Sequence, residues 1–141
     1  MPPPVLRPDV TIDWLTRRQA GTLPAQFGIV VTRLAPGVLE TALEIQPWMR
    51  APNGYLHAAV AIALADTSCG YACTAHLPEG ARGFTTAELK SNFLRTALDG
   101  RLTCAATADH TGRSTHVWSA TVRTPDGEPM ALFRCTQLIL R

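Results

Sequence analysis

The chain has 141 residues, of which 46% are hydrophobic and 17% are charged. This length supports one hydrophobic core and is too short for two domains of usual size. The charged fraction lies below the roughly 25% of an average soluble domain, which argues against disorder and indicates that part of the surface is hidden, as in an oligomer. The net charge is only +2 and the basic residues are scattered, so we expect no nucleic-acid partner.

The N-terminus and the cysteines bear on the compartment. The segment MPPPVLR at the start lacks the apolar stretch of a secretion signal, so we expect a cytoplasmic protein. The four cysteines (Cys69, Cys73, Cys104 and Cys135) could by count form two disulfides, but a domain of this size does not need them. Cys69 and Cys73 could share a helix face with His76 nearby, which leaves a metal site open. Buried free cysteines are the favoured interpretation, and we expect no metal.

The first half of the chain predicts a short helix, a hairpin and a long helix. Residues 9–19 form the short helix, with Trp14 and Leu15 facing inward. Residues 28–34 and 37–46 are extended, and the turn 35–37 joins them as a hairpin. The inward face of the second strand carries Leu39, Thr41, Leu43 and Ile45, opposite Glu40, Glu44 and Gln46.

Residues 56–75 predict the long helix. They are rich in alanine, contain no proline and follow an Asn53-Gly54 turn. The segment is apolar nearly all round, as in a helix buried on several sides. Its longest apolar run ends at Asp66, well short of the ~20 residues of a membrane span, so we expect no membrane.

Four extended segments follow, at 85–93, 102–109, 114–124 and 129–140. The first alternates Ala87, Leu89, Ser91 and Phe93 with Thr86, Glu88, Lys90 and Asn92; the third places His116, Trp118, Ala120 and Val122 on one face; the facing of the last is not fixed. The order predicts an α+β fold, a curved antiparallel β-sheet wrapped around one long central α-helix. We expect residues 1–24 to be an N-terminal extension and residues 25–141 to be a single domain.

Asp66 is the residue that the helix pattern does not explain. It is the only charged residue between Arg50 and Glu79. An ionised carboxylate in a dry core costs several kcal/mol, so it is hydrogen-bonded, exposed in a cleft or kept for chemistry. Capping by Thr67 or Ser68 is the structural alternative, and a functional site is the other.

The start of the same helix offers a second chemical feature. The amides of Ala58 and Ala59 lack acceptors within the helix and lie at its positive end, where they can stabilise an oxyanion. His57 precedes them and is more often a cap than a catalyst. A direct pair between His57 and Asp66 is excluded because nine helical residues span roughly 13 Å.

Three segments of the chain match motifs of one known family. Segment 52–66 (PNGYLHAAVAIALAD) is similar to P-x-G-x-x-H-G-G…L-A-D, segment 86–97 (TAELKSNFLRTA) is similar to T-V-D-L-x-x-x-F-L-R-P-A, and residues 112–114 (GRS) are similar to a G-R-[RS] turn. Together these segments resemble the hotdog-fold acyl-CoA thioesterases of the PaaI-like, phenylacetate-degradation type. The resemblance covers roughly residues 25 to 140 and implies the hotdog fold.

The resemblance implies roles for individual residues. Asp66 would be the nucleophile on the thioester or the general base for water, with Thr86 orienting water or carboxylate from the facing subunit. The amide of Ala58, beside His57, would polarise the thioester carbonyl. The segments that would hold coenzyme A contain Phe93, Arg95, Thr96, His110, Gly112, Arg113 and Ser114, whose arginines suit phosphate, although solvated surface arginines are the alternative.

Two departures from the family pattern bear on activity. Ala51 stands where the family has Asn or Gln, and Ala58-Ala59 replaces Gly-Gly. The added methyl groups narrow the helix N-terminus, which predicts reduced activity or an altered substrate size. A hotdog protein that binds acyl-CoA without hydrolysing it is therefore the alternative function; an enoyl-thioester hydratase is less favoured because no paired Asp and His lie on one loop.

The leading expectation is a cytosolic acyl-CoA thioesterase that acts on an aromatic or medium-chain acyl group. Coenzyme A would enter as part of the substrate, with no separate cofactor. The resemblance also implies a homodimer with two sites at its interface, paired into a dimer-of-dimers tetramer, which agrees with the low charged fraction.

Overall fold

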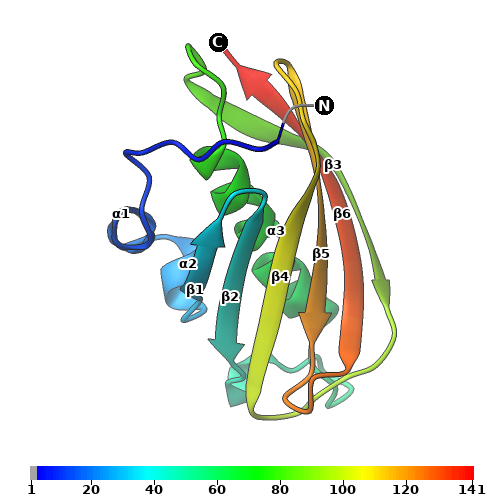
Figure 1. The fold of residues 1–141 in the computed structure, drawn as a ribbon. Helices are drawn as coiled ribbons and strands as arrows, with labels where there is room; N and C mark the ends of the chain where they lie inside the picture. Colours follow the sequence, from blue (N-terminus) through cyan, green and yellow to red (C-terminus); the bar gives the residue numbers. More distant parts are fainter. Residues whose placement is uncertain (1–2) are drawn as a thin grey trace.

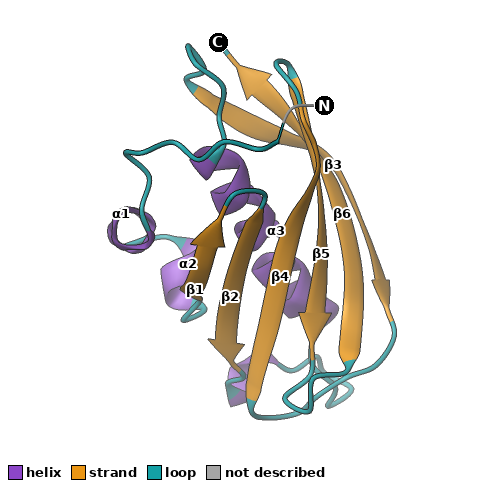
Figure 2. Ribbon diagram, in the orientation of Figure 1, coloured by secondary structure: helices purple, strands orange, loops and turns teal. Residues whose placement is uncertain are grey.

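The computed structural model describes residues 3–141, which build one curved sheet, one long helix and a helical N-terminal segment (Figures 1 and 2). Helix α1 (Ile12–Arg18) confirms the predicted short helix. The Thr11 hydroxyl accepts from the Trp14 amide as its cap, and Leu15 is buried. A second short helix, α2 (Leu23–Gln26), lies where no element was predicted.

Six antiparallel strands form the sheet. They are β1 (Val30–Ala35), β2 (Val38–Glu44), β4 (Arg101–Thr111), β5 (Thr115–Arg123), β6 (Pro129–Leu140) and β3 (Gly83–Phe93), in that spatial order. A single 3-10 turn, η1 (Pro47–Met49), follows β2. The sheet curves around helix α3 (Ala58–Ala75), so the predicted α+β architecture is confirmed (Figure 1).

The strand patterns place the core on the concave face of the sheet. The β1–β2 turn is closed by Gly37 at φ +73, a conformation that glycine adopts without strain. Leu39 and Leu43 are buried as predicted. The four alternate residues of β5 predicted to share one face are buried too: His116, Trp118, Ala120 and Val122. In β6 the inward side chains include Phe133, Cys135, Gln137 and Ile139.

Helix α3 fills the concave face. It begins at Ala58, two residues later than predicted, because His57 is its N-cap. Its length and mean hydropathy of 1.3 would by themselves suit a membrane span, but half of it is buried within the fold, where it packs against the sheet. It is the core helix that the composition predicted.

Strand β3 departs from the predicted facing. A β-bulge between Thr86 and Glu88 shifts the register, so Thr86 pairs with the buried Gln137 while Leu89 pairs with the buried Cys135. Thr86 therefore lies on the concave, helix-facing side and not on the face of Glu88, as alternation had predicted. The strand is also the sheet edge, and Leu89 and Phe93 are 40% and 48% exposed.

Candidate active site

The Asp66 carboxylate lies in a cavity without a partner. Its Oδ1 atom is buried and has no hydrogen bond from any residue in 3–141. Burial raises the pKa of this carboxyl above its usual value of 3.8. The structural alternative of capping is not what the chain shows, because the Ser68 hydroxyl lies 2.7 Å from both the Leu64 carbonyl and the Thr41 hydroxyl. Asp66 is thus a half-buried base in an apolar helix.

Thr86 lines the same cavity as Asp66 within one chain. The cavity measures about 320 Å³ and is lined by Asp66, Thr67, Gly70, Tyr71, Thr74, Phe84 and Thr86. The Thr86 hydroxyl donates to Gln137 Oε1 at 2.8 Å. The bulge turns Thr86 toward the helix of its own chain, and the expected role of Thr86 from a facing subunit stays a prediction.

The N-terminus of α3 offers one amide where two were predicted. His57 Nδ1 accepts from the Ala59 amide at 3.0 Å, so that donor is already used and His57 acts as the cap. The Ala58 amide has no acceptor in the described part of the chain, and Ala58 is exposed. The Ala58 amide therefore remains the donor for an oxyanion, at the positive end of an 18-residue helix.

Asp66 and the Ala58 amide cannot serve one thioester within a protomer. Eight helical residues separate them, which is about 12 Å along the helix axis. Each feature has its own cavity. The one at the helix N-terminus is lined by Tyr55, Leu56, Ala58, Ala61, Phe93, Arg95, Thr96 and Met130.

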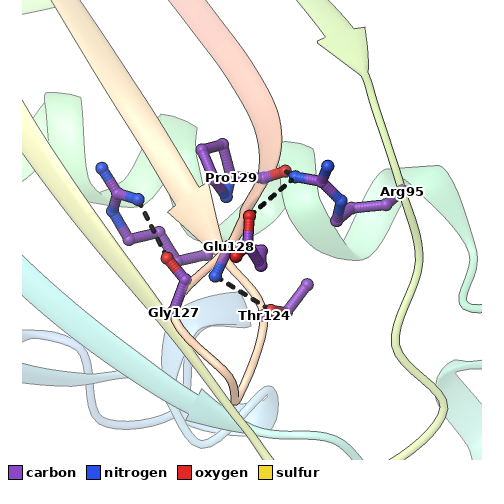
Figure 3. Close-up of polar contacts among 6 residues, drawn as sticks. Arg95, Thr124, Gly127, Glu128 and Pro129 are labelled. Atoms are coloured by element: carbon purple, nitrogen blue, oxygen red, sulfur yellow. Dashed lines mark hydrogen bonds and ion pairs between the residues drawn. The ribbon is translucent and has the colours of Figure 1, made fainter.

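The first group of predicted coenzyme-binding residues gathers at that second cavity. Phe93, Arg95 and Thr96 all line it, at the end of β3. Arg95 donates to the Pro129 carbonyl at 2.5 Å and lies 3.6 Å from the Glu128 carboxylate, on the turn between β5 and β6 (Figure 3). This ion pair is exposed, so a phosphate can compete with Glu128 for the guanidinium.

The second predicted group lies at the other end of the sheet. His110, Gly112, Arg113 and Ser114 belong to the β4–β5 turn and its strand ends, on the side of the molecule where the C-terminal Arg141 contacts Arg113 (Figure 1). An 11-residue strand such as β4 is roughly 35 Å long. One protomer therefore does not bring Arg95 and Arg113 together.

Several residues of the site were not predicted from the sequence. Tyr71, Thr74 and Phe84 line the Asp66 cavity, and Gln137 holds Thr86. The spacing of Gly70 and Thr74 from Asp66, four and eight residues along a helix, could have placed those two residues on its face. Gln137 needed the strand register, which the sequence alone did not fix.

The cysteines and histidines form no metal site. All four cysteines are free and buried, and no three His, Cys, Asp or Glu side chains within residues 3–141 could together hold a metal ion. His76 is buried too, where its Nε2 accepts from the Gly37 amide and its Nδ1 donates to the Ala72 carbonyl. These side chains belong to the core.

A sheet wrapped around one helix, with an unpaired carboxylate on that helix and an open helix N-terminus, defines a hotdog-fold hydrolase. Residues 53–131 match the thioesterase superfamily, and the chain belongs to that family. The resemblance seen in the sequence is thereby confirmed.

Individual relatives agree with this assignment. The 1,4-dihydroxy-2-naphthoyl-CoA hydrolase of Listeria monocytogenes is 30% identical over 116 residues, which are 81% of this chain and 92% of the relative. A variant thioesterase from Pseudomonas aeruginosa superposes with a TM-score of 0.89 at 26% identity, covering 96% of this chain and 97% of that one. The PaaI protein from the phenylacetic acid degradation operon of E. coli shares the fold, with a TM-score of 0.80 at 21% identity and 89% of both chains covered. Family and relatives support thioester hydrolysis.

Proposed function

We propose that this protein is a cytosolic acyl-CoA thioesterase in which Asp66 activates the attack on the thioester. The observation that carries the proposal is the Asp66 carboxylate, half-buried, unpartnered and facing a cavity. A carboxylate with a raised pKa is a stronger base than a solvated one. The thioesterase family membership supports a thioester as the substrate, and Arg95 at the end of β3 suits the phosphates of coenzyme A.

In the general-base route, Asp66 takes a proton from water as the water oxygen attacks the thioester carbonyl. The oxyanion that forms is stabilised by the Ala58 amide. When the tetrahedral intermediate collapses, the carbon–sulfur bond breaks and the thiolate leaves with the proton that Asp66 held. In the nucleophilic route, an Asp66 oxygen attacks the thioester carbonyl, the carbon–sulfur bond breaks and the thiolate leaves, and water then hydrolyses the anhydride between Asp66 and the acyl group. Either route needs the carboxylate and the amide on opposite sides of one carbonyl.

A second copy of the chain supplies the missing half of each site. The outer edge of β3 pairs with no strand in the described chain, and exposed Leu89 and Phe93 lie along it. If two β3 strands pair antiparallel about a two-fold axis near the middle of the strand, the Thr86 end of one copy lies beside the Phe93 end of the other. This brings the Asp66 cavity of one copy to the Ala58 cavity of the other. We therefore propose a homodimer with two shared sites, paired further into a tetramer.

The assay that tests the function compares wild type with Asp66→Asn on a panel of aromatic and medium-chain acyl-CoAs. We expect the variant to lose about 10²–10⁴-fold in kcat, the range of a lost general base. Asparagine keeps the shape and removes a buried charge without a partner, so the variant should be at least as stable as wild type. Asp126→Asn, in the exposed β5–β6 turn, is the matched control and should keep full activity.

Single turnover in oxygen-18 water tests for the nucleophilic route. If water attacks the Asp66 carbonyl carbon of the anhydride, the first acid released carries an oxygen from Asp66 and stays unlabelled, whereas the general-base route labels the acid at once. Label in the first acid therefore excludes attack at Asp66 but not attack at the acyl carbon. Equal turnover by Asp66→Asn would remove Asp66 from both mechanisms.

The alternative function, binding without hydrolysis, rests on Ala51 and the methyl groups of Ala58 and Ala59. Ala51 has no side-chain donor, and its amide instead bonds to the Tyr55 carbonyl at 2.7 Å. Hydrolysis that depends on Asp66 anywhere in the panel rules this alternative out. Acyl-CoA binding without turnover in wild type would favour it.

A further inference from the structure

Two cavities meet at one wall beside Asp66. The Asp66 cavity of about 320 Å³ and a larger one of about 580 Å³ next to α1 share Tyr71, Thr74 and Phe84 in their linings. The larger cavity has a mixed lining, in which Val10, Trp14, Leu15, Leu77 and Ala81 are apolar and Arg7, Asp9, Arg18 and Arg82 are charged. The shared side chains are therefore the partition between the reaction cavity and a larger space behind it, which offers apolar side chains to an acyl chain and charged ones nearby.

The path from Asp66 to this partition follows one face of α3. Asp66, Gly70 and Thr74 are spaced four residues apart, so they line about 12 Å of the helix. A Cβ atom at Gly70 would come within 3.2 Å of the Phe84 ring, so the glycine lets that ring lie close to the helix backbone. An elongated group that starts at Asp66 would run along this face and meet the Tyr71 and Phe84 rings.

Tyr71 is held in place by α1. Its hydroxyl donates to Gln19 Oε1 at 2.7 Å, and Gln19 Nε2 donates in turn to the Ile29 carbonyl at 2.8 Å. Burial raises the pKa of Tyr71 to about 12, so the hydroxyl stays a neutral donor. Gln19 thus ties the Tyr71 ring to the N-terminal segment, 52 residues away in the chain.

We propose that Tyr71, held by Gln19, is the end wall of the acyl pocket and sets the longest acyl group that the enzyme accepts. This inference rests on the proposed function, because it places the thioester at Asp66 with the acyl group directed along α3. Short or compact acyl groups fit in front of Tyr71. Longer chains need the apolar side chains of the cavity next to α1 (Val10, Trp14, Leu15 and Leu77), which Tyr71 closes off.

The test is a chain-length profile of kcat/KM from acetyl-CoA to palmitoyl-CoA for wild type, Tyr71→Ala, Tyr71→Phe and Gln19→Ala. Tyr71→Ala should move the optimum to longer chains and raise the ratio of lauroyl-CoA to butyryl-CoA turnover at least about tenfold, since each methylene in an apolar pocket changes kcat/KM by about tenfold or more. Gln19→Ala should shift the profile in the same direction by less. Tyr71→Phe keeps the ring, so its shift should be the smallest.

A binding measurement supports the profile without relying on turnover. Trp14 lines the α1 cavity, so dodecanoate that enters it should change tryptophan fluorescence in Tyr71→Ala and not in wild type. The double variant Tyr71→Ala/Trp14→Phe should lose this response. Circular dichroism checks that each variant is folded. If Tyr71→Ala does not fold, the chain-length profile of Gln19→Ala tests the proposal in its place.

The outcomes separate the two proposals. If wild type hydrolyses none of the acyl-CoAs, the proposed function fails. If wild type is active but Tyr71→Ala and Gln19→Ala keep its chain-length profile, the end wall is refuted while the thioesterase stands. A uniform loss of activity at every chain length would also overturn the end wall, because it would show a positioning role with no effect on length.

Discussion

Asp66 is placed where ionisation is costly, and this makes its charge state measurable. Burial raises the pKa of its carboxyl above 3.8, and the reaction needs the ionised form. We therefore expect kcat/KM to fall on the acid side with a midpoint above 3.8. Asp66→Glu keeps a carboxylate and should keep an acid limb, while the residual activity of Asp66→Asn should lack one. The same limb in Asp66→Asn would assign it to another group.

The Ala58 amide can be removed without removing the helix. Proline is tolerated at the first helical position, and His57 at φ −64 and ψ 131 already has the backbone conformation that precedes a proline. Ala58→Pro should therefore fold with little change in Tm and lose about 10²–10³-fold in kcat, as for a lost oxyanion donor. Ala58→Gly keeps the amide and removes the methyl group, so it should match or exceed wild-type kcat. Full activity in Ala58→Pro would exclude the amide from catalysis.

At the scale of elements, two buried histidines join the end of α3 to the sheet. His76 bonds to the β1–β2 turn, and His116 Nδ1 lies 3.4 Å from Cys73 Sγ. Burial and the neighbouring His76 lower the pKa of His116 from 6.5 to about 4, and burial also lowers the pKa of His76. Both rings are therefore neutral in the folded protein at neutral pH.

These histidines predict acid lability. Below pH 6.5 these histidines bind protons in the unfolded chain but stay neutral in the folded chain, so the free energy of unfolding falls as the pH falls. The fall due to His116 ends below its folded pKa of about 4. His116 alone should lower the free energy of unfolding by about 3 kcal/mol over this window. Urea titrations from pH 7 to about pH 4 measure the loss. His116→Gln should make the free energy of unfolding depend less on pH, whereas the exposed control His110→Gln should keep most of the wild-type dependence. An unchanged pH dependence in His116→Gln would contradict the assignment.

The elements that could be predicted from the sequence are those with one clear periodicity. Helix α3 stands out by composition, and β2 and β5 alternate because one face meets α3 and the other does not. Helix α2 was missed because four residues show no period. The facing of Thr86 was wrong because a bulge changes the alternation, and no local pattern in the sequence marks the bulge.

The candidate site also has residues that the sequence alone could reveal and residues that required the fold. Asp66 could be found because a lone charge in an apolar helix has a physical cost that sequence alone reveals. The Tyr71–Gln19 contact could not, since it joins residues 52 apart through the packing of α1. The separation of Arg95 from Arg113 also required the strand order, because both follow strands and look equivalent along the chain.

The proposed shared site would make the monomer incomplete, and this would give the 17% charged fraction a physical role. Leu89, Phe93 and Leu94 are exposed at or just after the unpaired edge of β3, next to both halves of the site. Light scattering of wild type should therefore give a mass of at least a dimer. A monomer mass would contradict the shared site directly.

Mixing two inactive variants tests the shared site itself. Asp66→Asn and Ala58→Pro each remove one half, so each homodimer has two defective sites. In a mixed dimer, one site combines the intact Asp66 of one copy with the intact Ala58 amide of the other, and the second site carries both defects. Because random exchange makes half of the dimers mixed, the mixture should regain about a quarter of wild-type kcat. Mixing Asp66→Asn with itself under the same unfolding and refolding cycle is the control. If each protomer worked alone, every copy would carry one defect, and the mixture would stay as inactive as its components.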